Sequence, residues 1–417
     1  MTKWFCCNST IQKMKKILTL LLISIYSKAF GQESINTIIE YPLIIQDSPA
    51  QLFTMDQFNT NYLSLYRLLS HELDQNTNRI ASSIIKTGLV AFFFTPLTHE
   101  EGHRSILTKE NIGSVSQPFF NKHGAAYVKG VNDLTLQNLR NNSLPTYIRL
   151  HTAGLESDYV LSLQEEALLA FEQEDYKNLY IEAIFRKFSL FSYYTFSLIP
   201  QIQPELQEEK NELERDIVGH DVYGAIRHLH RPDMDFYRYT NHNHLTKQEN
   251  QFLTRVSIRS LINLVSLPFL KPLKLSPTFK STTITLGYTM VPFGDLTEVN
   301  LWINNSSNMH IYLRGYQNKD NWFPALGLKI YNLKLSDYLE LETGCHGWLQ
   351  PEKLSFITSK GKPGGALNVM AKYKFSNQSR FSLNAGIHAK TYGFLPGNMY
   401  LEDNIGLMLG LSYYRYN

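Results

Sequence analysis

This chain of 417 residues has few cysteines and almost no excess of charge of either sign. Of its three cysteines, Cys6 and Cys7 lie outside the predicted mature chain, so Cys345 stands alone there and no intramolecular disulfide is expected. The net charge is only +3, and no stretch rich in arginine and lysine with interleaved aromatic residues occurs. The small net charge and the lack of a basic stretch both argue against a nucleic-acid partner.

Aromatic side chains, by contrast, are plentiful, with 25 tyrosines and 24 phenylalanines. This is more than a core usually needs, and it indicates β-rich or membrane-interface surfaces. The length of the chain is sufficient for two or three domains and a sizeable core.

Residues 1–31 have the features of a signal peptide. Lys13, Lys15 and Lys16 precede the apolar run 17–25, and Ala29-Phe30-Gly31 forms a small-x-small cleavage site. The apolar run is short for a membrane span, which favours cleavage over an uncleaved membrane anchor. We therefore expect export, with the mature chain in the periplasm or outer membrane of a Gram-negative bacterium.

A motif with a clear chemical interpretation is His99-Glu100-Glu101-Gly102-His103, which reads H-E-x-x-H. On a helix, two histidines four residues apart leave the same face and can hold one metal ion. Glu100 is placed between them to polarise a metal-bound water molecule rather than to bind the metal. The alternative is a charged helix surface that matches the pattern by chance.

The segment 88–94 before this motif is very apolar. Thr95 as N-cap and Pro96 at the first helical position predict a helix that begins there and carries both histidines. The alternative is one long helix that is kinked at Pro96. Counted from Ile84, the apolar segment is interrupted by Lys86 and Thr87, which makes it a poor transmembrane span.

Further helices are predicted in the N-terminal part. Apolar residues at helical spacing indicate helices over 57–73, from about Asn78 and over 156–200, and the acidic stretch 204–218 is expected to form a solvated helix. The aromatic segment 185–199 is interpreted as a core helix, with a membrane-surface helix as the alternative. We expect a β-like piece at 38–45 and loops with short strands over 111–150.

From about residue 276 the pattern changes to short alternating runs separated by turn residues, as in a β-meander. Eight strands are predicted, within 283–290, 298–303, 309–314, 325–335, 339–342, 367–374, 381–388 and 405–416. We therefore expect an α+β chain, in which a helical domain over 32–275 precedes an eight-stranded antiparallel β-barrel or β-domain over 276–417.

One face of these strands is apolar, and the other carries charges of both signs. The charged residues are Glu298, Arg314, Glu340, Glu342, Lys372, Lys374 and Lys390. Such a face suits the polar interior of a small barrel whose outside meets lipid, and the pattern resembles small bacterial outer-membrane barrels. We expect membrane contact through this domain; the alternative is a water-soluble sandwich or barrel with its apolar face inward.

A catalytic zinc site needs a third protein ligand, and Glu156, with Asp158 two residues later, is the best candidate. Here the chain resembles the zincin metallopeptidases of the gluzincin group, which pair H-E-x-x-H with a glutamate on a second helix and a nearby aspartate. The resemblance implies that His99, His103 and Glu156 bind Zn²⁺. Glu100 would then be the general base, and Asp158 would orient a ligand histidine.

The chain departs from the gluzincin pattern in its spacings. The Glu-x-Asp spacing is tighter, and the gap between His103 and Glu156 is long and contains His123. No third histidine follows the motif closely, so the metzincin pattern is absent. His220 and Asp221 are therefore kept as alternatives for the third ligand.

A second group of candidates is His220, Tyr223 and Arg227. On a helix these residues share a face by i, i+3, i+7 spacing, and any of them could stabilise the oxyanion that forms opposite the metal. The alternative is a polar helix face without a catalytic role. Four further histidines are expected in loops or on the surface: His228, His230, His242 and His244.

Together these features predict an exported zinc metallopeptidase that hydrolyses peptide or protein substrates with water activated at H-E-x-x-H. The alternative is a non-catalytic outer-membrane protein whose periplasmic helical domain binds or scaffolds a partner. A zinc hydrolase that acts on a non-peptide amide or ester is a third interpretation, because the motif does not select the bond.

Overall fold

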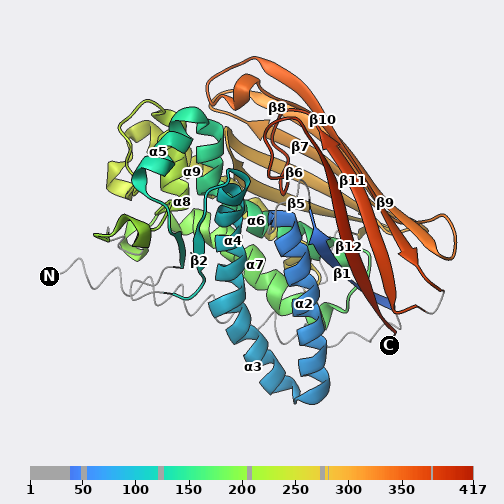
Figure 1. Cartoon of the computed structure of the whole chain (residues 1–417). Coiled ribbons are helices and arrows are strands. Elements are labelled where there is room, and N and C mark those ends of the chain that lie inside the picture. The colour runs from blue at the N-terminus through green and yellow to red at the C-terminus, as the bar shows by residue number, and fades with distance from the viewer. Residues whose placement is uncertain are drawn as a thin grey trace.

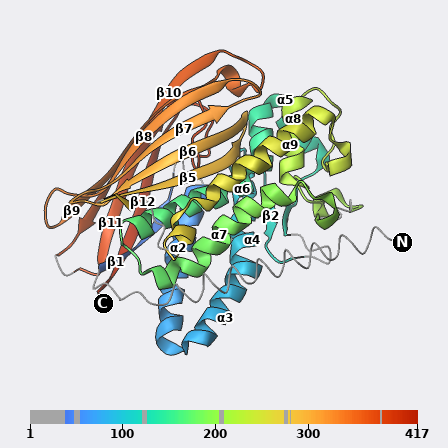
Figure 2. The same cartoon turned by 180° about the vertical axis from the view of Figure 1, so that it is seen from behind.

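The computed structural model describes residues 38–47, 54–120, 126–203, 209–272, 278–279, 281–376 and 379–416. The predicted signal peptide, Cys6, Cys7 and His123 lie outside these residues. In the described part, a layer of helices covers one face of a large antiparallel sheet, and most of the opposite face is left uncovered (Figures 1 and 2).

The C-terminal part forms all eight predicted strands. Their bounds are β5 (Thr282–Val291), β6 (Gly294–Ile303), β7 (Asn308–Gln317), β8 (Trp322–Lys334), β9 (Leu339–Pro351), β10 (Gly361–Lys374), β11 (Phe381–Lys390) and β12 (Asn404–Tyr416). Two more strands, β1 (Ile38–Gln46) and β4 (Thr278–Phe279), complete the sheet. The order across the sheet is β1-β12-β11-β10-β9-β8-β7-β6-β5-β4.

The predicted α+β class is confirmed, whereas the prediction of a closed eight-stranded barrel is wrong. Among the described residues the sheet is open: β1 forms one edge beside β12, and β4 forms the other edge beside β5. The predicted β-like piece near the N-terminus supplies β1, which raises the strand count. A small barrel fills its interior with its own side chains, but here whole helices lie on the inner side of the sheet.

The helical layer is built around α6 (Leu144–Ala170), a 27-residue helix that is buried along most of its length. It packs against α4 (Thr95–Lys109), α7 (Tyr176–Phe196), α8 (Asp221–His230) and β5. The remaining helices are α2 (Met55–Asn76), α3 (Arg79–Leu89), α5 (Asp133–Asn142), α9 (Lys247–Ser260) and α10 (Leu267–Leu270). A small ribbon of β2 (Val115–Gln117) and β3 (Tyr127–Lys129) lies beside α4.

Helix α4 continues from α3 through a π-helical turn, η2 (Val90–Phe94). The amide of Thr95 bonds to the carbonyl of Val90, and this wider turn accommodates Pro96, which has no amide proton to donate. The alternative of one long helix is therefore confirmed, and Thr95 is not an N-cap. By length and composition the stretch Arg79–Lys109 could cross a membrane, a test that core helices of soluble proteins also pass.

Two other helical predictions change. The described part of the acidic stretch 204–218 contains only the 3₁₀ turn η4 (Glu212–Glu214), so the predicted helix is wrong there. The helix predicted over 156–200 is divided between α6 and α7 by a turn at 171–175. The core interpretation of 185–199 is confirmed, because Leu190 and Tyr194 of α7 belong to the main hydrophobic core.

The sheet turns its polar face towards the helices and its apolar face outward. Glu298, Arg314, Lys372 and Lys390 are buried on the inner face, and Tyr159 of α6 donates to Glu298 at 2.7 Å. Large apolar side chains of the other face are exposed, so the alternative with an inward apolar face is wrong. The main core joins residues of α6 to α9 with residues of β5 to β9, so position 276 marks a change from helices to strands and not a gap in packing.

A buried ion pair at Glu174 connects the turn after α6 with α2. The carboxylate of Glu174 accepts from Arg67 Nε at 2.6 Å and lies 3.0 Å from His71 Nε2. Burial raises the pKa of Glu174, but Arg67 and His71 outweigh burial and hold the pKa at about 2.

We expect Glu174→Gln to lower the free energy of unfolding by about 3–5 kcal/mol at neutral pH, because Arg67 stays buried without its partner. The folded pKa lies below the ordinary value of 4.5. The ionised carboxylate therefore stabilises the folded chain above about pH 4.5, and this contribution is lost as the pH falls towards about 2. Urea unfolding at neutral and acidic pH should show the difference between wild type and variant narrowing in acid; an unchanged difference would contradict the account.

Candidate metal centre

The two motif histidines lie where α4 and α6 approach each other closely. A Cβ added to Gly102 of α4 would lie 2.4 Å from the carbonyl oxygen of Ala153 on α6, so a larger residue would push the helices apart. His99 and His103 are one turn apart on α4, and both rings reach Gly154 of α6. The helical spacing of the motif thus places both imidazoles on one side of a tight helix crossing.

Asp221, the first residue of α8, forms a group of possible metal ligands with His99 and His103. Their ligand atoms lie within 4.8 Å of one another. Asp221 Oδ2 is 3.0 Å from His99 Nε2 and 3.3 Å from His103 Nε2. Burial raises the pKa of Asp221, but the two imidazoles outweigh burial and hold the pKa well below its ordinary value. The group therefore combines two imidazole nitrogens with an ionised carboxylate.

Hydrogen bonds on the far side of each ring fix how the two imidazoles are oriented. His99 Nδ1 lies 2.8 Å from Asp158 Oδ2, and His103 Nδ1 lies 2.6 Å from the carbonyl oxygen of Leu150. Both acceptors favour a proton on Nδ1, so each Nε2 faces Asp221 and would present its lone pair to a metal ion bound there. The predicted position of Asp158 beside a motif histidine agrees with this geometry.

The two distances from Asp221 to the histidines are of the size that a zinc site requires. Tetrahedral zinc with bonds of about 2.0–2.1 Å separates two ligand atoms by roughly 3.3 Å, close to the two distances from Asp221. A Cβ added to Gly154 would lie 2.4 Å from His99 Nε2 and 2.5 Å from His103 Nε2. Glycine therefore keeps open the space beside both nitrogens, and a zinc ion held by these three groups would have a fourth position for water or substrate.

Arg186 of α7 supports this group and was not identified from the sequence. Its buried guanidinium donates to Asp158 Oδ1 and to Thr98 Oγ1, each at 2.6 Å. Because the other oxygen of Asp158 contacts His99, Arg186 positions the carboxylate that orients the ring. No local spacing relates Arg186 to the H-E-x-x-H motif, so the sequence alone offered no signal for it.

Glu100 is buried between the two histidines on α4. Burial raises the pKa of Glu100 to about 7, although His99 and His103 act in the opposite direction. A carboxylate whose pKa lies near neutrality can both accept and return a proton, as a general base requires.

Tyr193 of α7 is a second residue that the sequence analysis missed. Its ring stacks on His99 with centroids 5.7 Å apart, and it lies 5.3 Å from the ring of His220. Its hydroxyl oxygen accepts from the backbone amide of Asp221 at 3.4 Å. Burial raises the pKa of Tyr193 well above its ordinary value, so the hydroxyl keeps its proton and can donate it to a neighbouring oxygen.

Glu156 is not brought to the two motif histidines, so its predicted role as third ligand needs correction. Gly154 and Asp158 are one turn apart and face α4, whereas Glu156, two residues from each, lies on the opposite side of α6. Its carboxylate accepts two hydrogen bonds from Arg149, at 2.6 and 2.9 Å. The carboxylate that joins the histidines is Asp221, the alternative that the sequence had left open.

The predicted oxyanion group is only partly assembled. His220 is the N-cap of α8 rather than part of its helical face, and its ring stacks on Tyr223 at 3.7 Å. The Tyr223 hydroxyl donates to a backbone carbonyl at the end of α7 at 2.6 Å, and Arg227 lies 5.4 Å over the ring of Tyr237. Of the three residues, His220 is the one whose ring lies beside Tyr193.

His228 is fully buried, so its predicted surface position is wrong. Its Nδ1 lies 2.8 Å from the carbonyl oxygen of Gly224, and its ring stacks on His151 with centroids 5.2 Å apart. His230 is also partly enclosed, with Nδ1 3.0 Å from the carbonyl of Ile226. These contacts place both histidines in the packing of α8.

No family model, curated protein or solved structure matches this chain. The case for a function therefore depends on the geometry of the group formed by His99, His103 and Asp221, with Glu100 beside it.

Gly154 provides a sharp test of this geometry. We expect Gly154→Ala to reduce zinc affinity at least 100-fold, because the added Cβ would displace both Nε2 atoms while hydrogen bonds hold the other side of each ring. Titration with zinc against a competing chelator measures the effect, and Gly88→Ala on α3 is a control, since nothing lies within 4 Å of its added Cβ. Unchanged zinc affinity in Gly154→Ala would contradict the site.

Proposed function

We propose that this protein is an exported zinc-dependent hydrolase that cleaves peptide bonds. The observation that carries the proposal is the meeting of His99, His103 and Asp221, whose ligand atoms lie within 4.8 Å of one another. The sequence motif alone offers two ligands; the aspartate from α8 supplies the third that a catalytic zinc site requires.

In the proposed reaction, His99, His103 and Asp221 would hold a zinc ion, which would supply a Lewis acid for the scissile carbonyl and lower the pKa of a bound water. Glu100 accepts the proton of the attacking water and returns it to the leaving amine, for which a pKa near 7 is well suited. Tyr193 keeps its hydroxyl proton and can stabilise the developing oxyanion. Asp158, held by Arg186, keeps His99 in the orientation that presents Nε2.

Zinc analysis of the purified mature protein, together with an assay on a mixture of fluorogenic peptides, tests the proposal. We expect one zinc per chain, peptide cleavage that a chelator abolishes and zinc restores, and loss of both metal and activity in His99→Ala. If zinc is bound but only ester or non-peptide amide substrates are cleaved, the protein is a zinc hydrolase that does not act on peptide bonds. A protein without bound zinc would instead support the non-catalytic binding or scaffold function.

A further inference from the structure

The outward face of the sheet is a continuous apolar surface. Strand registers place one row of neighbours across eight strands: Ile284, Leu301, Ile311, Leu328, Cys345, Leu367, Ala389 and Ile405. The next row contains Ile303, Met309, Ile330, Thr343, Val369, Ile387 and Leu407. Within the described strands β5 to β12, two charged side chains are in register with this face: Arg415, near the end of β12, and Asp295, which is buried at the start of β6 and paired with Arg255 and Arg259 of α9.

Most of this face is exposed; α9 and the 3₁₀ turn after it cover one corner, where Tyr288, Met290 and Asp295 are buried. Leu326, Leu383 and Leu407 are 54%, 48% and 63% exposed. With strands about 4.8 Å apart, eight strands make a surface roughly 38 Å wide. Monomeric soluble proteins rarely expose contiguous apolar patches of more than a few hundred Å², and larger patches mark protein or membrane contacts.

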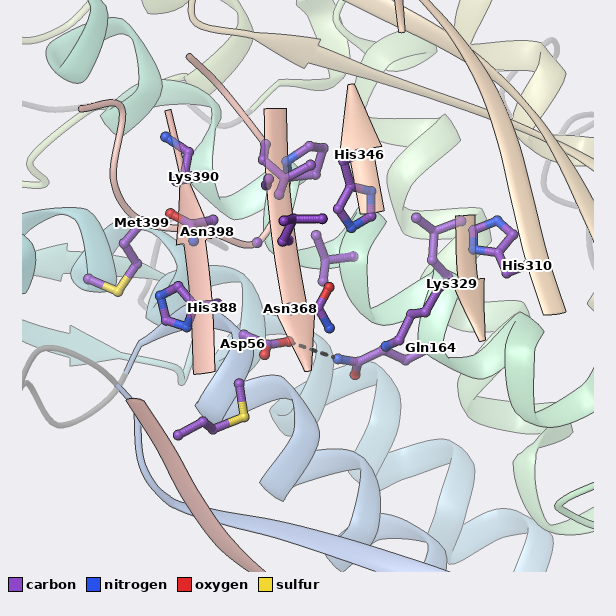
Figure 3. A pocket seen from close by; sticks show the side chains of 18 of the residues that line it. Asp56, Gln164, His310, Lys329, His346, Asn368, His388, Lys390, Asn398 and Met399 are labelled. Atoms are coloured by element: carbon purple, nitrogen blue, oxygen red, sulfur yellow. Dashed lines mark hydrogen bonds between the residues drawn. The ribbon is translucent and has the colours of Figure 1, made fainter. Parts of the chain in front are cut away.

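The inner face of the same sheet is polar and partly hollow. Between it and helices α2 and α6 lie a cavity of about 260 Å³ and a neighbouring one of about 650 Å³. Both are lined by Asp56, Gln164 and Lys329, and Figure 3 shows these side chains and His388 around the smaller cavity. A sheet with a polar, hollow inner side and an apolar outer side has the polarity of a lipid-facing sheet, whose interior is polar.

Aromatic residues gather at one end of the apolar face. Phe381 pairs with Tyr413 in register, and their ring centroids are 5.5 Å apart. Tyr373 and Phe375, at the end of β10, lie at the same end of the sheet, with ring centroids 5.8 Å apart. Such belts of aromatic side chains are typical of the level where a membrane protein passes from hydrocarbon to headgroups.

We propose that the outward face of the sheet lies against the hydrocarbon of a lipid bilayer, with the aromatic end near the headgroups. This inference goes beyond the proposed hydrolysis and does not depend on it. A bilayer is favoured over a second copy of the chain because protein interfaces normally include direct hydrogen bonds, about one per 100–200 Å². The apolar face offers few side chains for such bonds, and hydrocarbon requires none.

Flotation of the mature chain from Gln32 with phosphatidylcholine vesicles tests the proposal. We expect the wild type to float with the vesicles, and the triple variant Leu326→Lys, Leu383→Lys, Leu407→Lys to float at least tenfold less, because charge on a lipid-facing side is strongly unfavourable. All three positions are exposed, so the variant should keep the circular dichroism spectrum of the wild type. The matched control is Ile84→Lys, Leu134→Lys, Ile258→Lys, which charges equally exposed apolar positions on α3, α5 and α9.

Several outcomes would overturn the proposal. A wild-type chain that stays in the aqueous fraction would overturn it, whatever its oligomeric state. If light scattering shows that this chain is a dimer, a second copy covers the apolar face instead of lipid. Loss of flotation in the control but not in the sheet variant would place the contact on the helices instead. His99→Ala should float like the wild type, so failure of the proposed hydrolysis is distinguishable from failure of membrane contact.

Discussion

Replacing Glu100 with glutamine should leave zinc bound and lower peptide turnover by roughly 10²- to 10⁴-fold, the usual contribution of a general base. Glutamine has nearly the same shape as glutamate but cannot accept the proton of the attacking water. Glu100 is not one of the three proposed ligands, since the group consists of His99, His103 and Asp221. Metal content should therefore equal that of the wild type.

The neighbouring Glu101 provides a matched control for this experiment. It lies on the same turn of α4, is also buried, and forms an ion pair with Arg104. We expect Glu101→Gln to retain most of the activity. Full activity in Glu100→Gln, or equal losses in both variants with normal zinc, would contradict the role assigned to Glu100.

Replacing Asp221 with alanine should reduce zinc affinity more than 100-fold, because loss of a partner that merely supports a ligand already costs about 10- to 100-fold. Glu156→Gln should leave zinc affinity unchanged. It should instead lower the free energy of unfolding by about 3–5 kcal/mol, because Arg149 would stay buried without the carboxylate that pairs with it. The two variants thus distinguish a metal ligand, Asp221, from a carboxylate in a structural ion pair, Glu156.

Zinc titrations and urea unfolding of both variants distinguish these roles. If Glu156→Gln loses zinc while Asp221→Ala keeps it, the gluzincin-like assignment would be right and the geometric one wrong. If both variants lose zinc only in proportion to the unfolded fraction, neither residue is a ligand.

Much of the β-structure could be predicted from the sequence because alternation is a local signal. All eight predicted strands form, and the β-like piece near the N-terminus is a real strand, β1. Its pairing with β12 joins residues more than 350 positions apart, and no local pattern specifies such a partner. The closed barrel was inferred from alternating strands with one charged face, and it failed because edge pairing and the inner helices are long-range features.

The candidate metal site likewise combines residues that helical spacing brings together with residues that only tertiary packing brings together. His99, Glu100 and His103 lie on one helix, and helical spacing alone brings them together. Asp221 reaches them only through the packing of α8 on α6, and Arg186 and Tyr193 only through α7. The choice of Glu156 followed the gluzincin pattern of a glutamate with a nearby aspartate, but residues two apart on a helix face nearly opposite ways, so Asp158 faces α4 and Glu156 does not.

The most direct test of the proposed centre is zinc analysis with zinc X-ray absorption spectroscopy on the wild-type mature chain. We predict one zinc per chain, bound by nitrogen and oxygen atoms at about 2.0–2.2 Å with an imidazole signature. Absence of zinc, or a sulfur ligand near 2.3 Å from Cys345, would contradict a site built from His99, His103 and Asp221.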